Sequence, residues 1–324
     1  NDSIYVNYAT GMYSATGRSV ERLLNCVGGY LPMYGDYSTG MHQYVMPFMY
    51  GVGVSPYENI SASSVDQAQN ADLVLMFGNS PADNRMGGAN VVWDYNTVRE
   101  AGPEIIHIDY RLNETAAGYP SEWLPIRTGT DAALVAGIAH ELITNDWVDL
   151  DFLHKYCVGY DEETMPASAK GQNKSYHDYI MGLGYDKVEK TPEWAAEITL
   201  VPAEKIRELA AKIHDAKAVF VVQGWGLQRH SNESATRAVC MLALLTGNLG
   251  KPGTNSGMRE AEPPGAPVGS LPASDEDPNG APMNMVNAKI SCYSWLKCID
   301  EGKDFQKELD ATDEIALFMG AQNP

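Results

Sequence analysis

The chain has 324 residues, a formal net charge of −19, 44% hydrophobic residues and 20% charged residues. That length can bury the cores of two domains, and the acidic charge disfavours nucleic-acid binding, which requires a basic surface. No apolar run approaches the ~18 residues that a membrane span needs. No two of the five cysteines have CxxC spacing, so we expect neither a zinc knuckle nor an iron–sulfur cluster in this segment.

The clearest structural signal comes from two apolar segments joined by a turn and a helix. Residues 73–77 form a continuous apolar run, which is typical of a parallel strand covered on both faces. Gly78 begins a turn, and we expect a helix over about 86–101. Residues 105–108 form a second buried strand that ends at Asp109. This order predicts a βαβ unit.

The same alternation of strands and helices continues along the chain. We expect a short strand at 124–126, a helix from Thr130 or Asp131 to about 144, helices and loops over 149–200, a helix from Pro202 to about 214, a strand at 218–222 and a helix at about 233–245. Residues 260–287 are rich in Pro, Gly, Ser and Asp, which predicts a long loop. A short helix near 293–301 and a final strand complete the predicted elements.

A weak internal repeat joins residues 72–81 and 314–324. Both have an acidic residue, an apolar strand, Gly, an amide residue and Pro. Because ligands bind beyond the carboxyl ends of strands in open α/β sheets, the repeat indicates two related nucleotide-binding crevices. The alternative, that two buried strands merely look alike, stays open. The first residue is Asn rather than Met, and a terminal buried strand needs neighbours, so we expect a fragment of a longer polypeptide.

Two acidic residues follow predicted strands. Asp109 can bind ribose hydroxyls, but it lies further past Gly78 than the roughly 20 residues of a dinucleotide fold, and no GxGxxG motif is present. An ordinary NAD site is therefore disfavoured, whereas a nucleotide site of another kind is not. Asp131, in Gly129-Thr130-Asp131, can accept the two N–H donors of a guanine edge. A plain helix cap is the more common explanation of such a residue.

The densest candidate site is the segment 223–230. Its two glycines bring backbone close to a ligand, and Trp225, Arg229 and His230 supply a stacking plane and donors suited to phosphate or a fused heterocycle. The alternative is a core tryptophan with Arg229 and His230 in solvent. Ser38 lies in a polar, glycine-bounded turn without a GxSxG elbow, so a hydrolase nucleophile is unsupported.

Five motifs, in this order, resemble the dimethyl sulfoxide reductase family of molybdopterin oxidoreductases. They are residues 25–40, 123–134, 152–161, 223–230 and 245–250. The resemblance runs over nearly the whole chain, and the joint pattern is specific although each motif alone is weak. The family binds molybdenum through two molybdopterin guanine dinucleotides, and Ser38 matches the position of a serine metal ligand. An alkoxide is a hard ligand, which suits an oxophilic metal.

The resemblance implies two-electron oxygen-atom transfer that reduces S-oxides or N-oxides. It makes Ser38, Tyr8 and Arg259 the catalytic residues. Tyr8 matches an active-site tyrosine of soluble sulfoxide reductases, which have Tyr-Gly-Trp where this chain has Tyr8-Ala9-Thr10, and the missing indole bears on substrate preference. The implied cofactor-binding residues are Ala9, Thr10, Gly11, Asp83, Asn84, Asp109, Tyr110, Gly129, Thr130, Asp131, Trp225, Gly226, Arg229 and Asn323. Reductive dehydroxylation and a catalytically inert, cofactor-free module remain alternatives, whereas a nicotinamide dehydrogenase lacks its glycine fingerprint.

The expected fold is α/β, with doubly wound, mainly parallel sheets in two lobes. Residues 37–252 are predicted to form the nucleotide-binding domain, and 1–36 with 253–324 the halves of a second domain. By resemblance, a [4Fe–4S] domain and a carboxy-terminal pterin-binding domain are missing here, so the fragment alone is expected to be inactive. Implied partners are an iron–sulfur electron-transfer subunit and a membrane anchor subunit. The family suggests the extracytoplasmic face of the membrane, although the sequence itself leaves the compartment open.

Overall fold

The structure is a computed structural model, in which the chain forms two compact units. Residues 48–264 make the larger unit, and residues 1–47 with 265–324 make the smaller one. The domain boundaries predicted from the sequence, after residues 36 and 252, stay a prediction. The residues that the structure describes are 3–6, 15–34, 45, 48–51, 62–84, 91–118, 121–224, 227, 233–259, 283–291 and 295–301.

The larger unit is built on a four-stranded parallel sheet in the order β5-β4-β3-β6. Its strands are β3 (Leu73–Phe77), β4 (Glu104–Asp109), β5 (Glu122–Pro125) and β6 (Val219–Gln223). The chain runs outward from β3 through β4 to β5 and then returns to the other side of β3 as β6. The carboxyl ends of β3 and β6 therefore flank the point where the strand order reverses, and open α/β sheets bind ligands at such a point.

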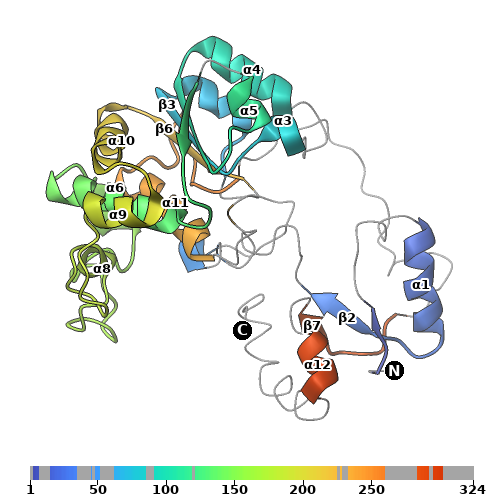
Figure 1. Cartoon of the computed structure of the whole chain (residues 1–324). Coiled ribbons are helices and arrows are strands. Elements are labelled where there is room, and N and C mark those ends of the chain that lie inside the picture. Colours follow the sequence, from blue (N-terminus) through green and yellow to red (C-terminus); the bar gives the residue numbers. More distant parts are fainter. Residues whose placement is uncertain are drawn as a thin grey trace. The chain divides into compact units, whose positions relative to one another are not determined.

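Helices cover both faces of this sheet (Figure 1). Leu75 and Phe77 pack on one face with α6 (Asp131–Thr144), α9 (Pro192–Thr199), α10 (Ala203–Asp215) and α11 (Glu233–Leu245). Val74 and Met76 pack on the other face with η2 (Val65–Asn70) and α4 (Val91–Ala101). Successive side chains of a strand point to opposite faces of the sheet, so a continuous apolar run packs into the hydrophobic core on each face. The predicted α/β, doubly wound class is confirmed.

Shorter helices complete the larger unit. They are α3 (Pro81–Asn84), α5 (Glu114–Ala117), α7 (Leu150–Tyr156) and α8 (Tyr176–Ile180). Side-chain oxygens cap the last three: Asn113 accepts from Ala116 N–H, Asp149 from Phe152 N–H, and Ser175 from Asp178 N–H. None of the helices among the described residues has the length and apolarity to cross a membrane.

Most of the predicted elements of this unit are confirmed. The strand at 73–77 and the helix at 233–245 match at both ends, and the strand at 105–108 is longer by one residue at each end. The described part of the helix predicted at 86–101 is α4, from Val91. The strand predicted at 124–126 is β5, which begins two residues earlier, at Glu122.

The smaller unit contains a parallel sheet in the order β1-β2-β7. Its strands are β1 (Tyr5–Val6), β2 (Leu31–Tyr34) and β7 (Ile290–Ser291), with α1 (Ala15–Cys26) between β1 and β2 and α12 (Trp295–Glu301) after β7. Leu31 and Ile290 are buried at its centre. The sheet thus joins the beginning of the chain to a segment far along the sequence. The strand predicted near residue 314 lies outside the described residues.

Candidate cofactor-binding site

The carboxyl ends of β3 and β6 approach each other closely. Gly224 N–H donates to the carbonyl of Phe77 over 2.9 Å, so the pairing of the two strands continues past their ends. A Cβ at Gly224 would lie 2.5 Å from both Asn79 Cα and the Gly78 carbonyl oxygen. Glycine is therefore required at this position by the neighbouring backbone. The ends of β3 and β6 are therefore in direct backbone contact at the point where the strand order reverses.

We expect Gly224→Ala to lower the free energy of unfolding by about 2 kcal/mol, because the new methyl group meets backbone that cannot rotate away. Denaturant unfolding would measure the loss. Gly102→Ala is the matched control: Gly102 has a φ of +90° but no atom within 4 Å of a Cβ. Its cost is backbone strain alone, about 1 kcal/mol. Equal losses in the two variants would contradict the steric explanation.

Asp83 and Asn84, predicted to face the cofactor, lie on α3 directly after the β3 turn. Asp83 Oδ2 accepts from Arg111 Nη2 over 2.9 Å and from Ser80 Oγ. The hydroxyl of Thr115 accepts from Ala82 N–H over 3.0 Å and so ties α3 to α5. The Asp83 side chain is therefore engaged with Arg111 on the loop after β4.

Asp109 is the last residue of β4 and is buried. Its Oδ2 accepts from Asn113 Nδ2 over 2.8 Å, and its carbonyl accepts from Trp123 Nε1 over 3.0 Å. Tyr110, the next residue, is 60% exposed. Asn113, which was not among the predicted site residues, both caps α5 and orients the Asp109 carboxylate. The signal was available, since an Asn directly before a helical segment is a common cap.

Asp131 begins α6, directly after the turn formed by Gly129 (φ +77°) and Thr130. Burial raises the pKa of the Asp131 carboxyl to about 6, its own backbone N–H lowers it, and the neighbouring Asp109 raises it. Thr130 Oγ1 donates to the carbonyl of Arg127 over 2.6 Å and does not cap the helix. The structure thus brings two predicted carboxylates near each other, and Thr130 occupies the N-cap position of α6, as the sequence allowed, but without a side-chain cap hydrogen bond.

Arg259 follows a buried turn of the larger unit and is partly exposed. The remaining predicted site residues lie outside the described part of the chain: Tyr8, Ala9, Thr10, Gly11, Ser38, Trp225, Gly226, Arg229 and Asn323. Within the part described, no three His, Cys, Asp or Glu side chains gather as a metal-binding group.

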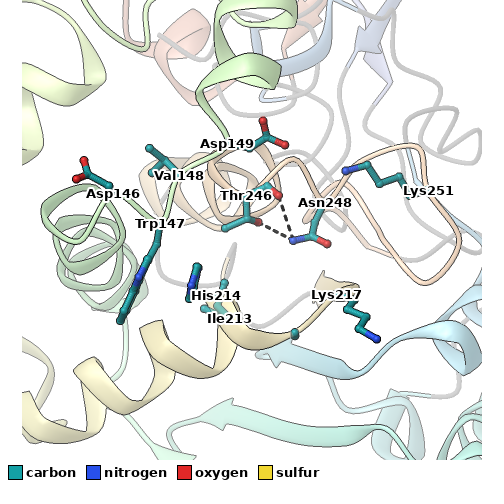
Figure 2. Close-up of a pocket in the computed structure, with 11 residues that line it drawn as sticks. Asp146, Trp147, Val148, Asp149, Ile213, His214, Lys217, Thr246, Asn248 and Lys251 are labelled. Atoms are coloured by element: carbon teal, nitrogen blue, oxygen red, sulfur yellow. Dashed lines mark hydrogen bonds between the residues drawn. The ribbon is translucent and has the colours of Figure 1, made fainter.

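A separate cavity of about 240 Å³ opens at the amino end of β6, at the edge opposite to this site (Figure 2). Trp147 and His214 stack there with ring centroids 4.6 Å apart. Asn248 is one of the residues that line it: Oδ1 accepts from Val219 N–H over 3.0 Å, and Nδ2 donates to Thr246 Oγ1 over 2.7 Å. The hydrogen bond to Asn248 therefore helps to hold the start of β6.

Comparison with known proteins identifies the family. The family model described as molybdopterin oxidoreductase matches residues 1–317. Dimethyl sulfoxide reductase DmsA of Escherichia coli is 44% identical over 94% of this chain and 37% of that protein. DmsA of Haemophilus influenzae is 41% identical over 94% of this chain and 37% of its own length. Trimethylamine-N-oxide reductase of Haemophilus influenzae is 29% identical over 98% of this chain and 39% of that protein.

The chain therefore spans only 37–39% of the length of these relatives. The family model nevertheless covers nearly all of it, and the fold is the parallel α/β architecture expected from the motifs. This chain belongs to the molybdopterin oxidoreductase family, whose name implies a molybdenum–pterin cofactor.

Proposed function

We propose that the protein containing this chain is a molybdenum-dependent oxidoreductase that reduces S-oxides or N-oxides. The overall reaction takes R₂SO, two electrons and two protons to R₂S and water. Family membership and the names of the relatives, which are dimethyl sulfoxide and trimethylamine-N-oxide reductases, support it. The observation that carries it is the pair of carboxylates, Asp109 and Asp131, at the carboxyl edge of the sheet.

This pair fits the guanosine end of a molybdopterin guanine dinucleotide. Asp131 is only 8% exposed, and among the described residues no other side chain donates a hydrogen bond to its carboxylate. A guanine edge offers two N–H donors to such a carboxylate, and a charge-assisted bond offsets its burial. Asp109, held by Asn113, would accept from the ribose hydroxyls. The positive φ of Gly129 brings backbone close to the same ligand.

The other residues of the proposed site rest on the resemblance. The cofactor is proposed to be bis(molybdopterin guanine dinucleotide) molybdenum, which supplies the two-electron redox chemistry when bound. Ser38 would complete its coordination with a hydroxyl oxygen. Tyr8 would donate a hydrogen bond to the substrate oxygen, and the Arg259 cation would offset negative charge beside it. Asn323 would contribute to a second nucleotide crevice.

Electron supply is also part of the proposal. Electrons would arrive through iron–sulfur centres outside this chain, including a [4Fe–4S] cluster, and through an iron–sulfur subunit with a membrane anchor. This part of the proposal rests on the resemblance, and no two of the five cysteines of this chain have CxxC spacing. Cysteine thiolates are the usual ligands of such clusters, and in this proposal they lie outside this chain.

The proposal is tested by metal and nucleotide analysis of the purified holoprotein, with reduction assays on three substrate classes. We expect molybdenum with about two guanine nucleotides per metal, and turnover of dimethyl sulfoxide or trimethylamine N-oxide. Turnover of catechols alone would replace the proposal by reductive dehydroxylation. A folded holoprotein preparation without molybdenum and guanine would leave only the scaffold interpretation.

A further inference from the structure

Residues 253–258 form a buried polar turn, here called the Asn255 turn. Thr254, Asn255, Ser256 and Met258 are all 0% exposed. Connecting segments normally lie at the surface, because buried backbone must find a partner for each N–H and carbonyl. A fully buried turn of polar residues therefore indicates a segment whose position is fixed by many contacts. Arg259 is the next residue along the chain.

Asn255 fixes this turn against the outer edge of β6. Its Nδ2 donates to the carbonyls of Val221 and Met258 over 2.8 and 2.9 Å, and its Oδ1 accepts from Ser63 N–H over 2.8 Å. Gly257, with a φ of +82°, packs on α11 so closely that a Cβ would lie 2.7 Å from Cys240 Cα. The turn is thus held from one side by the sheet and from the other by a helix.

Gln223 joins these elements at the point where β6 ends. Its side chain is 0% exposed. Its Nε2 donates to the carbonyl of Gly257 over 2.6 Å and to the carbonyl of Thr236 in α11 over 3.0 Å. Its Oε1 is buried and has no hydrogen-bond partner among the described residues. One amide therefore connects β6, α11 and the Asn255 turn.

We propose that Gln223 is a positioning residue that fixes Arg259 at the carboxyl edge of the sheet. The inference rests on the proposed function, in which Arg259 lies beside the substrate oxygen. The Gly257 carbonyl is two residues from Arg259, so loss of its bond to Gln223 shifts the backbone that carries the guanidinium. A displacement of about 1 Å at a reacting centre can cost about a hundredfold in rate.

The test compares Gln223→Met with Asn248→Leu in the holoenzyme. Methionine keeps the length of the side chain but donates no hydrogen bond. Asn248 is a buried amide bonded to the opposite end of the same strand, at Val219, so its variant controls for a general loss of stability. Hydrogen exchange of residues 254–259 and steady-state kinetics with dimethyl sulfoxide, normalised to molybdenum content, are the two readouts.

We expect Gln223→Met to speed exchange across residues 254–259 and to lower kcat/KM by about tenfold to a hundredfold. Asn248→Leu should speed exchange near Val219 and leave kcat/KM within about twofold, since a distant loss does not move the reacting groups. Unchanged exchange at 254–259 in Gln223→Met, or an equal kinetic loss in both variants, would overturn the proposal.

A double variant tests whether Gln223 acts through Arg259. Gln223→Met combined with Arg259→Lys should lose little more kcat/KM than Arg259→Lys alone, because both changes disturb one interaction. Additive losses would show that Gln223 acts elsewhere and would overturn the inference.

Two further comparisons keep the test decisive. If Gln223→Met does not fold, Tyr50→Phe replaces it, because the Tyr50 hydroxyl donates to the Ser256 carbonyl of the same turn. The same exchange and kinetic changes, smaller in size, are then expected, and their absence would overturn the inference. If the wild type reduces neither S-oxides nor N-oxides, the proposed function fails, whereas hydrogen exchange still decides whether Gln223 holds the turn.

Discussion

Ser38→Ala is expected to lower S-oxide and N-oxide reduction by the holoenzyme at least about a thousandfold, equivalent to about 4 kcal/mol of transition-state stabilisation. A methyl group cannot coordinate a metal, so the proposed hydroxyl ligand is lost. The proposed guanosine-binding residues Asp109 and Asp131 are untouched, and we therefore expect the fold and the nucleotide content to persist. Steady-state assays, molybdenum analysis and thermal unfolding of the same preparation would measure all three.

Thr39→Ala is the matched control for this variant, since it removes the hydroxyl of the next residue along the sequence. It should retain turnover within about threefold, because its hydroxyl is not the proposed metal ligand. Retained wild-type turnover in Ser38→Ala would refute the ligand assignment. An equal loss in both variants would mean that the segment as a whole, and not the Ser38 oxygen, is required.

The fold was predictable where a strand packs against a hydrophobic core on each face of the sheet, or where a helix has one apolar face. Residues 73–77 show this, because every side chain in the run is buried. The start of β5 was not predictable, because Glu122 is a charged residue at the beginning of a strand. Its carboxylate pairs with Lys205 and Lys212 on α10, and that pairing joins residues far apart in the sequence. A local pattern cannot show such a partner.

The candidate site was predictable only in part, for a related reason. Glycines and acidic residues at strand ends mark a ligand edge locally, and Asp109 and Asp131 were found that way. Their mutual approach depends on the parallel register of β4 and β5, which pairs Asp109 with Pro125. The amides of Gln223 and Asn255 bond backbone 34 residues away. Neither amide has a sequence signature, since only the folded chain supplies the carbonyls that they satisfy.

Asp131→Asn should make the cofactor-free protein more stable at neutral and alkaline pH. The pKa of the Asp131 carboxyl is raised from 3.8 to about 6, mainly by burial. A folded-state pKa above the unfolded value means that folding is favoured while the group is protonated, and that this advantage is lost as pH rises from about 4 through 6. The cost at pH 8 is about 3 kcal/mol, which a neutral amide of the same shape removes.

Urea unfolding of cofactor-free protein at pH 4 and pH 8 would test this. We expect Asp131→Asn to gain about 3 kcal/mol at pH 8 and little at pH 4. Asp146→Asn is the control, because Asp146 is exposed, and it should change stability by less than about 0.5 kcal/mol at either pH. If Asp131→Asn lowers the free energy of unfolding at pH 8, the prediction that the buried Asp131 carboxylate destabilises the cofactor-free protein is wrong.

The same variant should lose cofactor while it gains stability. The amide introduced by Asp131→Asn would present an N–H donor where the carboxylate accepts two donors, so the holoprotein should contain less guanine nucleotide per chain. A buried carboxylate lowers the stability of the cofactor-free protein. Such a cost is typical of a binding site, because the ligand, and not the protein, supplies the hydrogen-bond donors to the carboxylate. If Asp131→Asn is more stable and still retains full guanine content, the carboxylate does not bind guanine.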